Sequence, residues 1–256
     1  MSNRNGMPIW YELLSTNPDA STTFYEHVIG WTIGAKPSGD FDYRTIAVGD
    51  SGVAGLMHLT RGMAADGAKA TWLFYIGVDD VDATVAAITE KGGTVIKPAW
   101  DMPGVGRMAF VTDPQGNPFY VMTSASNGTS TAFDRFGMGK CNWNELVTSD
   151  HATGDAFYAD VFGWTYPGRM TMPGDMGDYV FVSVGDVGIG ATMHASGDAA
   201  PGWRFYFRTP DIDATVAKVG EAGGKVLMGP HDVPGGDRII LATDSHGVVF
   251  GAVGPG

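Results

Sequence analysis

The sequence repeats itself along almost its whole length, and this repeat constrains the fold more than any other feature. Several blocks return in the second half in the same order: Trp10-Tyr11-Glu12-Leu13 as Trp143-Asn144-Glu145-Leu146, Phe24-Tyr25 as Phe157-Tyr158, Gly30-Trp31 as Gly163-Trp164, Met57-His58 as Met193-His194, and Asp82-Ala83-Thr84-Val85 as Asp213-Ala214-Thr215-Val216. The spacing changes only between blocks, where loops tolerate insertion and deletion. Two copies of one structural repeat therefore fill almost the whole chain, and any function belongs to one copy or to the pair.

Length, charge and cysteine content exclude several classes of protein. The 256-residue chain is long enough for two domains with separate cores. Its net charge of −12 predicts no nucleic-acid partner, because a phosphate backbone requires clustered Lys and Arg. We expect no membrane span, because no apolar run reaches about 18 residues, and no secretion signal, because residues 1–6 lack an apolar segment. The single cysteine, Cys141, excludes an internal disulfide and is typical of a cytoplasmic location.

Local patterns predict both strands and helices. Short runs rich in aromatic and β-branched residues predict strands, and in the first copy they are Ile9–Leu14, Tyr43–Val48, Val53–Leu59, Trp72–Val78, Arg107–Thr112 and Pro118–Met122. One helix is predicted from Ala20 to Ile29 after the capping residue Asn17, and another from Ala83 to Lys91, closed by glycines. The start and the stop signals of the second helix each lie 63 residues after those of the first (Asp19 to Asp82 and Gly30 to Gly93). Each copy is therefore predicted to hold two smaller β-α-β-β-β modules.

A change of composition marks the boundary between the copies. Residues 124–140 contain Ser-Ala-Ser-Asn-Gly-Thr-Ser-Thr and then Phe133 and Phe136, which is typical of a linker with anchoring aromatics. We therefore predict a first domain over 1–123, a linker over 124–140 and a second domain over 141–256. Cys141 is expected to be a small buried residue near the start of a strand.

Three motifs together resemble the vicinal oxygen chelate superfamily, which contains glyoxalases, extradiol dioxygenases, and bleomycin and fosfomycin resistance proteins. They are the helix that ends Phe-Tyr-x-x-Val-Ile-Gly-Trp, the segment Val78–Ala83, and the segment Val111–Pro118, which reads Val-Thr-Asp-Pro-Gln-Gly-Asn-Pro. The resemblance covers roughly 8–123 and 141–254. It implies an α+β fold of tandem glyoxalase-like domains, each built of two paired β-α-β-β-β modules that form curved sheets around a cleft, with helices on the outer face.

The resemblance also implies where a divalent metal would be held. Metal-using members take ligands from the first, fourth, fifth and eighth strands, which correspond to Trp10, His58, Leu73 and Tyr120 in the first copy and to Trp143, His194, Arg204 and Gly251 in the second. Only the histidines are ligand types, whereas a catalytic ion usually needs three protein ligands. We therefore expect no metal cofactor. The alternative is a divalent metal held by His58 and Glu12, which shares a strand face with Trp10.

Without an ion, carbonyl chemistry needs a carboxylate base and a fixed hydrogen-bond donor. The predicted bases are Glu12 and Glu145, because a carboxylate in an apolar setting is a stronger base, and the predicted donors are His58 and His194. The residues expected to contact substrate are Trp10, Leu73, Tyr75, Tyr120, Trp143, Arg204 and Tyr206. The alternatives are a buried polar pair for Glu12 and His58 and core packing for the tyrosines.

One substitution predicts that the two clefts have diverged. Arg204 stands where the first copy has Leu73, and an inward arginine is costly unless it pairs, with Glu145 as the nearest candidate. We therefore expect one cleft to keep the original activity.

Two functions remain open for such a chain. The first is a glyoxalase-like lyase or isomerase that acts on a small carbonyl compound or its thiol adduct without the usual metal. The second is non-catalytic binding of an aromatic or antibiotic-like molecule, which needs only an apolar cleft with a few polar anchors. An extradiol dioxygenase is disfavoured because its two-His-one-carboxylate iron set is missing from the expected strands. In either case we expect a small-molecule ligand, no nucleic acid, no membrane, and a monomer or weak homodimer.

Overall fold

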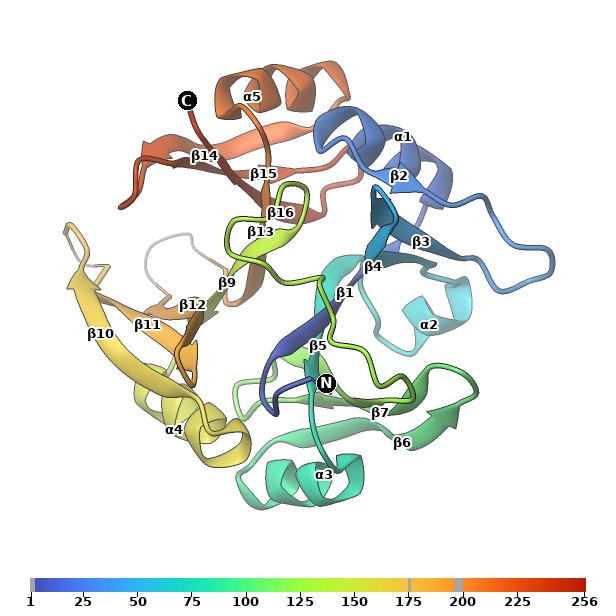
Figure 1. Ribbon diagram of the computed structural model, residues 1–256, viewed down its shortest axis with the longest axis vertical. Coiled ribbons are helices and arrows are strands. Elements are labelled where there is room, and N and C mark those ends of the chain that lie inside the picture. Colours follow the sequence, from blue (N-terminus) through green and yellow to red (C-terminus); the bar gives the residue numbers. More distant parts are fainter. Residues whose placement is uncertain (1–2, 175, 196–199) are drawn as a thin grey trace. The chain divides into compact units, whose positions relative to one another are not determined.

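The computed structural model describes residues 3–174, 176–195 and 200–256, which form two open eight-stranded sheets and a few helices. The strand order is β2-β3-β4-β1-β5-β8-β7-β6 in the first sheet and β10-β11-β12-β9-β13-β16-β15-β14 in the second. The identical order in both sheets confirms that the repeated sequence encodes a repeated structure of the α+β class (Figure 1).

The elements of the first copy are β1 (Pro8–Ser15), α1 (Pro18–Val28), β2 (Thr32–Ile33), β3 (Tyr43–Val48), β4 (Ser51–His58), α2 (Arg61–Ala65), β5 (Thr71–Gly77), α3 (Val81–Glu90), β6 (Thr94–Met102), β7 (Gly106–Thr112) and β8 (Pro118–Ser124). Those of the second copy are β9 (Cys141–Thr148), α4 (His151–Phe162), β10 (Thr165–Thr171), β11 (Asp178–Val184), β12 (Val187–His194), β13 (Gly202–Arg208), α5 (Ile212–Glu221), β14 (Lys225–Asp232), β15 (Arg238–Thr243) and β16 (Val249–Gly254).

Each copy holds two β-α-β-β-β modules, as predicted. In every module the first strand pairs in parallel with the last, and the remaining pairs are antiparallel. The short helix α2 is the one described addition to this pattern, and it lies in the connection between the first two modules. In Figure 1, α3 lies along β6 and β7, and α5 lies along β14 and β15.

The helix boundaries follow from local chemistry that the sequence already displays. The Asn17 side chain accepts a hydrogen bond from the amide of Ala20 at 3.2 Å, and Pro18 occupies the first helical position of α1. The helix α3 begins in the same way, because the Asp80 carboxylate accepts a hydrogen bond from the amide of Ala83 at 3.0 Å. Such caps satisfy backbone donors that have no partner inside the helix.

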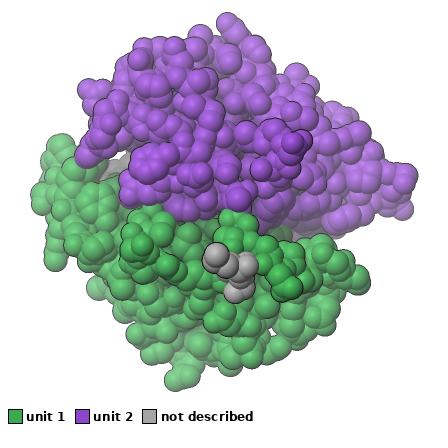
Figure 2. All heavy atoms as spheres, in the orientation of Figure 1, with its two compact units in different colours: residues 1–9, 74–130, 144–203 green, residues 10–73, 131–143, 204–256 purple. Residues whose placement is uncertain are grey.

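Packing divides the chain into two compact units (Figure 2). Unit 1 takes its described residues from 1–9, 74–130 and 144–203, and unit 2 from 10–73, 131–143 and 204–256. The domain boundaries at 123 and 141 stay a prediction, and each packed unit draws modules from both copies. Within unit 2, for example, α1 packs against α5.

Each unit has an aromatic core centred on a buried tyrosine. In unit 2 the ring of Tyr25 lies 5.5 Å from that of Trp31 and 5.4 Å from that of Phe250, measured between centroids. In unit 1 the ring of Tyr158 is stacked on Trp164 at 4.6 Å and lies 5.9 Å from Phe119. Aromatic side chains bury large areas, so these clusters contribute strongly to the stability of both units.

The two core tyrosines are also hydrogen-bonded in equivalent ways. The indole of Trp72 donates to the Tyr25 hydroxyl at 3.0 Å, and that of Trp203 donates to the Tyr158 hydroxyl at 3.3 Å. Tyr158 in turn donates to the Asp113 carboxylate at 3.1 Å. Burial, reinforced by the charge of Asp113, raises the pKa of Tyr158, which therefore stays protonated as a donor.

Two further sequence predictions concern single features. Cys141 is buried, is the first residue of β9, and donates its thiol hydrogen to the carbonyl of Trp143 at 3.3 Å, as expected for a small buried residue. No helix within the described ranges is long and apolar enough to cross a membrane.

Candidate functional site

The helices define the two faces of each sheet. On β1, the Ser15 hydroxyl lies 2.7 Å from the Ser21 hydroxyl of α1, so Ser15 faces this helix. Successive side chains of a strand alternate between faces. Glu12 and Trp10 therefore lie on the opposite face, which we call the helix-free face. The same alternation places Glu145 and Trp143 on the helix-free face of β9, because Thr148 contacts α4.

Strand register separates the predicted glutamate–histidine pairs, which is a correction to the sequence-based site. On β1 and β4, Glu12 pairs with Gly55, whereas His58 pairs with Ser15 on the helix-bearing face. The second copy behaves alike, because Glu145 pairs with Ala191 and His194 pairs with Thr148. A one-residue offset along a strand moves a side chain to the other face. The histidines thus do not join the glutamates, and Met57 and Met193 take the positions expected for them.

A buried carboxylate and a tyrosine lie on the helix-free face of the first module. Glu12 is only 2% exposed. The Tyr43 hydroxyl accepts a hydrogen bond from the indole of Trp10 at 2.9 Å, and a side chain at position 55 would collide with this tyrosine, so Gly55 is required there. Burial raises the pKa of Tyr43, the charge of Glu12 raises it further, and the Trp10 hydrogen bond opposes both. Tyr43 therefore remains a neutral donor beside Glu12.

The third module repeats this pair with a direct contact. The Tyr179 hydroxyl donates to the Glu145 carboxylate at 3.0 Å, and Glu145 is 5% exposed. Neither Tyr43 nor Tyr179 is among the site residues predicted from the sequence. The signal was present, because Asp42-Tyr43 and the following Val-Gly-Asp return as Asp178-Tyr179 and Val-Gly-Asp with the spacing of Met57 and Met193.

The second module presents a row of stacked rings on its helix-free face. Tyr75 and Tyr120 are paired across β5 and β8, and their rings are stacked at 4.2 Å between centroids. Phe110 is stacked on the other side of Tyr120 at 4.5 Å. Trp100 lies beyond, and the ammonium of Lys97 lies 3.8 Å from its ring centroid. The predicted contact residues Tyr75 and Tyr120 are buried and belong to a continuous series of stacked rings, which we call the aromatic row, whose half-buried members are Phe110 and Trp100.

The fourth module is different on the corresponding face. Tyr206 lies over Gly251, which stands where the first copy has Tyr120, and its ring would collide with any side chain there. The surrounding residues are mostly aliphatic: Leu241, Val253, Met228, Ile239 and the indole of Trp143. The guanidinium of Arg135, from the predicted linker, lies 4.9 Å from the Trp143 ring centroid. The two copies therefore differ in the surface that they offer to a ligand.

The remaining predicted contact residues lie on the strands as the alternation requires. Leu73 is buried on β5, on the face of Tyr75. Arg204 is half-buried on β13, on the face of Tyr206. The alternation of side chains between the two faces of a strand, which the sequence already showed, fixes the face on which each of these residues lies.

The residues present do not fit the metal set that the resemblance implied. The helix-free face of the first module offers one carboxylate, from Glu12, beside a tyrosine and an indole, and His58 lies on the other face. Among the described residues, no three His, Cys, Asp or Glu side chains are grouped closely enough to hold an ion. A catalytic divalent ion usually takes three protein ligands, mainly from these residue types. We therefore derive no catalytic step through a metal.

Comparison with known proteins identifies the family. The model of the Glyoxalase/Bleomycin resistance protein/Dioxygenase superfamily matches residues 9–121 and 140–251. The chain is 33% identical over 255 residues to CFP32 of Mycobacterium tuberculosis, which is named a candidate glyoxylase, covering 98% of this chain and 96% of that protein. It is 32% identical over 267 residues to the anthracycline biosynthesis protein DauV of Streptomyces sp. (97% and 93% covered). The chain belongs to this superfamily.

Solved structures share the fold at low sequence identity. The homoprotocatechuate 2,3-dioxygenase of Brevibacterium fuscum superimposes with a TM-score of 0.70 at 16% identity, covering 98% of this chain and 81% of that one. The Mn(II)-bound glyoxalase of Novosphingobium aromaticivorans gives a TM-score of 0.65 at 16% identity, covering 99% and 82%. These similarities confirm the tandem glyoxalase-like fold that the sequence predicted, and at such identity they show the fold alone.

Proposed function

We propose that the protein is a glyoxalase-like lyase or isomerase that acts on a small carbonyl compound or its thiol adduct without a divalent metal. The observation that carries this proposal is the buried glutamate–tyrosine pair on the helix-free face of both copies, with the direct 3.0 Å contact between Tyr179 and Glu145. Membership of the superfamily supports a small-molecule substrate.

The pair has the two groups that enolisation of a carbonyl compound requires. Glu145 takes the proton from the carbon next to the carbonyl, and the electron pair of that bond moves to the carbonyl oxygen. The Tyr179 hydroxyl then turns from Glu145 to donate a hydrogen bond to this oxygen as it becomes negative. In the adduct of a thiol with a 2-oxoaldehyde, Glu145 then returns the proton to the former carbonyl carbon, and the hydroxyl proton on the first carbon passes to the oxygen on that former carbonyl carbon. The first carbon becomes the new carbonyl, so the reaction is an isomerisation with no net oxidation.

The second copy is the better candidate for this activity. Its tyrosine hydroxyl donates directly to the carboxylate at 3.0 Å, and in the first copy the Tyr43 hydroxyl accepts a hydrogen bond from Trp10. The counterpart of Trp10 is Trp143, which packs against the aliphatic cluster around Tyr206. The proposed activity therefore belongs to Glu145.

The test compares Glu145→Gln with the matched variant Glu12→Gln, using methylglyoxal with glutathione or another thiol as substrate. General-base catalysis is worth about 10²- to 10⁴-fold, so Glu145→Gln should lower kcat by that factor while Glu12→Gln changes it little. Equal losses in the two variants contradict the asymmetry. Stoichiometric zinc, nickel or iron in tag-free protein, with activity lost on chelation and restored by the metal, contradicts the metal-free mechanism.

The aromatic row favours a second candidate function, which is binding of a flat ring system without chemistry. Tyr75, Tyr120 and Phe110 already stack on one another, and aromatic surfaces prefer offset stacking on further rings. The similarity to an anthracycline biosynthesis protein supports a polycyclic ligand. Tight binding of unreactive polycyclic aromatics, weakened by Tyr120→Ala, together with no turnover of any thiol–aldehyde pair, would favour this function over the first.

We also propose that the protein acts in the cytoplasm as a monomer or weak homodimer. The single buried cysteine and the presence of two copies in one chain support this. Light scattering at micromolar concentration measures the mass directly, and a stable assembly larger than a dimer contradicts the proposal.

A further inference from the structure

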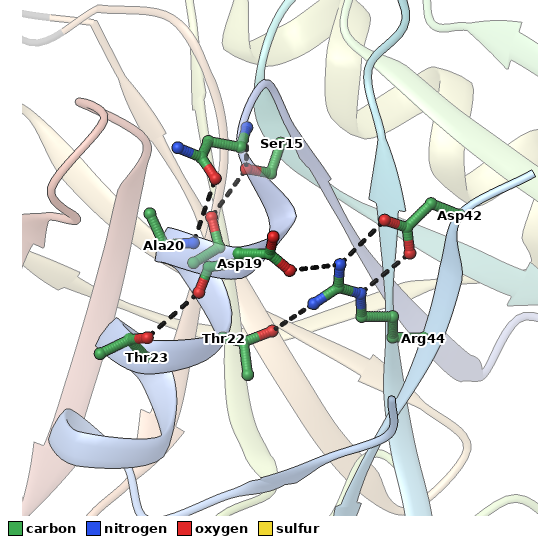
Figure 3. Close-up of polar contacts among 9 residues, drawn as sticks. Ser15, Asp19, Ala20, Thr22, Thr23, Asp42 and Arg44 are labelled. Atoms are coloured by element: carbon green, nitrogen blue, oxygen red, sulfur yellow. Dashed lines mark hydrogen bonds and ion pairs between the residues drawn. The ribbon is translucent and has the colours of Figure 1, made fainter. Parts of the chain in front are cut away.

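The helix-bearing face of the first module contains a buried guanidinium (Figure 3). Arg44, on β3, donates through Nε and Nη2 to the two carboxylate oxygens of Asp42, each at 2.9 Å. It also donates to Asp19 of α1 at 2.6 Å and to the Thr22 hydroxyl at 3.3 Å. Its side chain is 5% exposed. One carboxylate from α1 and one from the residue that precedes β3 thus bind the same guanidinium.

The third module has a related framework in which a valine stands at the position of Arg44. The repeated motifs place Asp178 where the first copy has Asp42, and Val180 where it has Arg44. Strand pairing confirms this, since Arg44 pairs with Leu56 and Val180 with Thr192. A hollow of about 500 Å³ lies beside Val180 and is lined by residues of α4, β10 and β11.

Two carboxylates again border this position. Asp178 lines the hollow from the start of β11, and Asp155 lines it from α4, at the position of Thr22. The carboxylate of Asp155 accepts a hydrogen bond from the Thr192 hydroxyl at 2.8 Å. Ala152 occupies the position of Asp19, so the second negative charge has moved one turn along the helix rather than disappeared.

The other polar groups near Asp155 are His151 and Tyr166. His151 lies 2.6 Å from the Thr192 hydroxyl and 3.6 Å from the Asp155 carboxylate. The Tyr166 hydroxyl donates to the backbone carbonyl of Asp155 at 2.8 Å, so it does not reach the charge. Burial raises the pKa of Asp155, although the Thr192 hydrogen bond and the charge of His151 oppose this. A cation placed here would stabilise the carboxylate.

The other charged residue at the hollow is Arg169 of β10. It lines the hollow and contacts Asp178 at 3.3 Å, and its side chain is largely exposed, so this pair is weak. The Thr171 hydroxyl also donates to Asp178, at 3.0 Å. Asp178 thus faces both the solvent and the hollow, and a ligand can approach along this side.

We propose that this hollow is a binding site for an alkylguanidinium cation, which would take the place that the Arg44 side chain fills in the first copy. The independent observation is Arg44 itself, because the equivalent framework of the same fold holds a guanidinium in this structure. A guanidinium has N–H donors that point in several directions within one plane, so it can bind two carboxylates on different sides better than an ammonium can. The site lies on the helix-bearing face, away from Glu145, so it is separate from the proposed active site.

The probe is ethylguanidinium chloride, titrated at constant chloride concentration into the whole protein and followed by calorimetry and by ¹H–¹⁵N NMR shifts. Saturable binding is expected, at least ten-fold tighter than that of ethylammonium, with the largest amide shifts in α4 and β11. Weak binding without saturation, or equal affinity for ethylammonium, overturns the proposal.

Two variants locate the site. Val180→Arg places in the third module the side chain that the first module already has, so it should abolish binding of the probe and raise the Tm. Asp155→Asn should weaken binding at least ten-fold, and it tests the site even if Val180→Arg does not fold. A matched control is Asp19→Asn, which removes an exposed carboxylate from the first module and should leave binding unchanged. Unaltered binding in both Val180→Arg and Asp155→Asn overturns the assignment.

Discussion

Removal of the buried guanidinium of the first module should produce one of the largest single-site losses of stability in this protein. Arg44→Met keeps the length and apolar character of the side-chain stem and deletes its charge. Asp42, whose side chain is 6% exposed, would then remain as a buried carboxylate without its partner. Breaking a buried ion pair from one side costs about 3–5 kcal/mol. The contact with Asp19 adds little, because that carboxylate is 86% exposed and exposed pairs contribute at most about 1 kcal/mol.

The loss should also depend on pH in a defined direction. The hydrogen bonds from Arg44 hold the pKa of Asp42 below its ordinary value. A carboxyl group with a lowered folded-state pKa contributes its full stabilisation above the unfolded-state pKa, near 3.9, and loses it as the pH falls through the folded-state pKa. The cost of Arg44→Met should therefore be complete at pH 7 and shrink below about pH 4.

Urea unfolding followed by tryptophan fluorescence at pH 7 and pH 3.5 measures this difference. Asp19→Asn is the matched control and should cost no more than about 1 kcal/mol at pH 7. The double variant with Asp42→Asn should cost less than the two single variants together, because it leaves no buried charge. The reasoning is refuted if Arg44→Met costs no more than Asp19→Asn, or if its cost is the same at both pH values.

Two further predictions concern buried groups outside the proposed sites. Tyr158→Phe removes a hydroxyl that both accepts from an indole and donates to Asp113, so it should cost about 1–3 kcal/mol in urea unfolding, and a neutral effect would show that these hydrogen bonds contribute little. The thiol of Cys141 is buried, and burial raises its pKa to about 12, so the native protein should not react with a disulfide reagent at pH 8 on the time scale of minutes, whereas the urea-unfolded chain should react at once. Rapid reaction of the native protein would contradict the burial of this residue.

The repeat made the fold predictable because it supplied several independent constraints at once. Capping residues such as Asn17, alternating strand patterns and motif order all agreed between the copies, and the structure confirms the four modules. Such agreement across levels is what a foldable sequence provides. The interleaved composition of the packed units could not be predicted in the same way, because contacts between distant modules leave no local pattern.

The site was predictable only in part, and the errors have a physical origin. Glu12 and Glu145 lie on the helix-free face because alternation from Trp10 and Trp143 fixes them. His58 and His194 were assigned by motif matching, which does not determine register to one residue, and one residue is enough to change faces. The resemblance assigned no role to the strands β3 and β11, which carry Tyr43 and Tyr179, so it did not single out either tyrosine.

The cores have a consequence for how such a chain arose. Tyr25 of the first copy packs on Phe250 of the second, and Tyr158 of the second packs on Phe119 of the first. A gene that encoded a single copy would make a polypeptide whose apolar rings meet a partner only in another identical subunit. In the present chain each copy therefore completes the aromatic core of the other. Proteolysis between the copies should nick it without releasing either half.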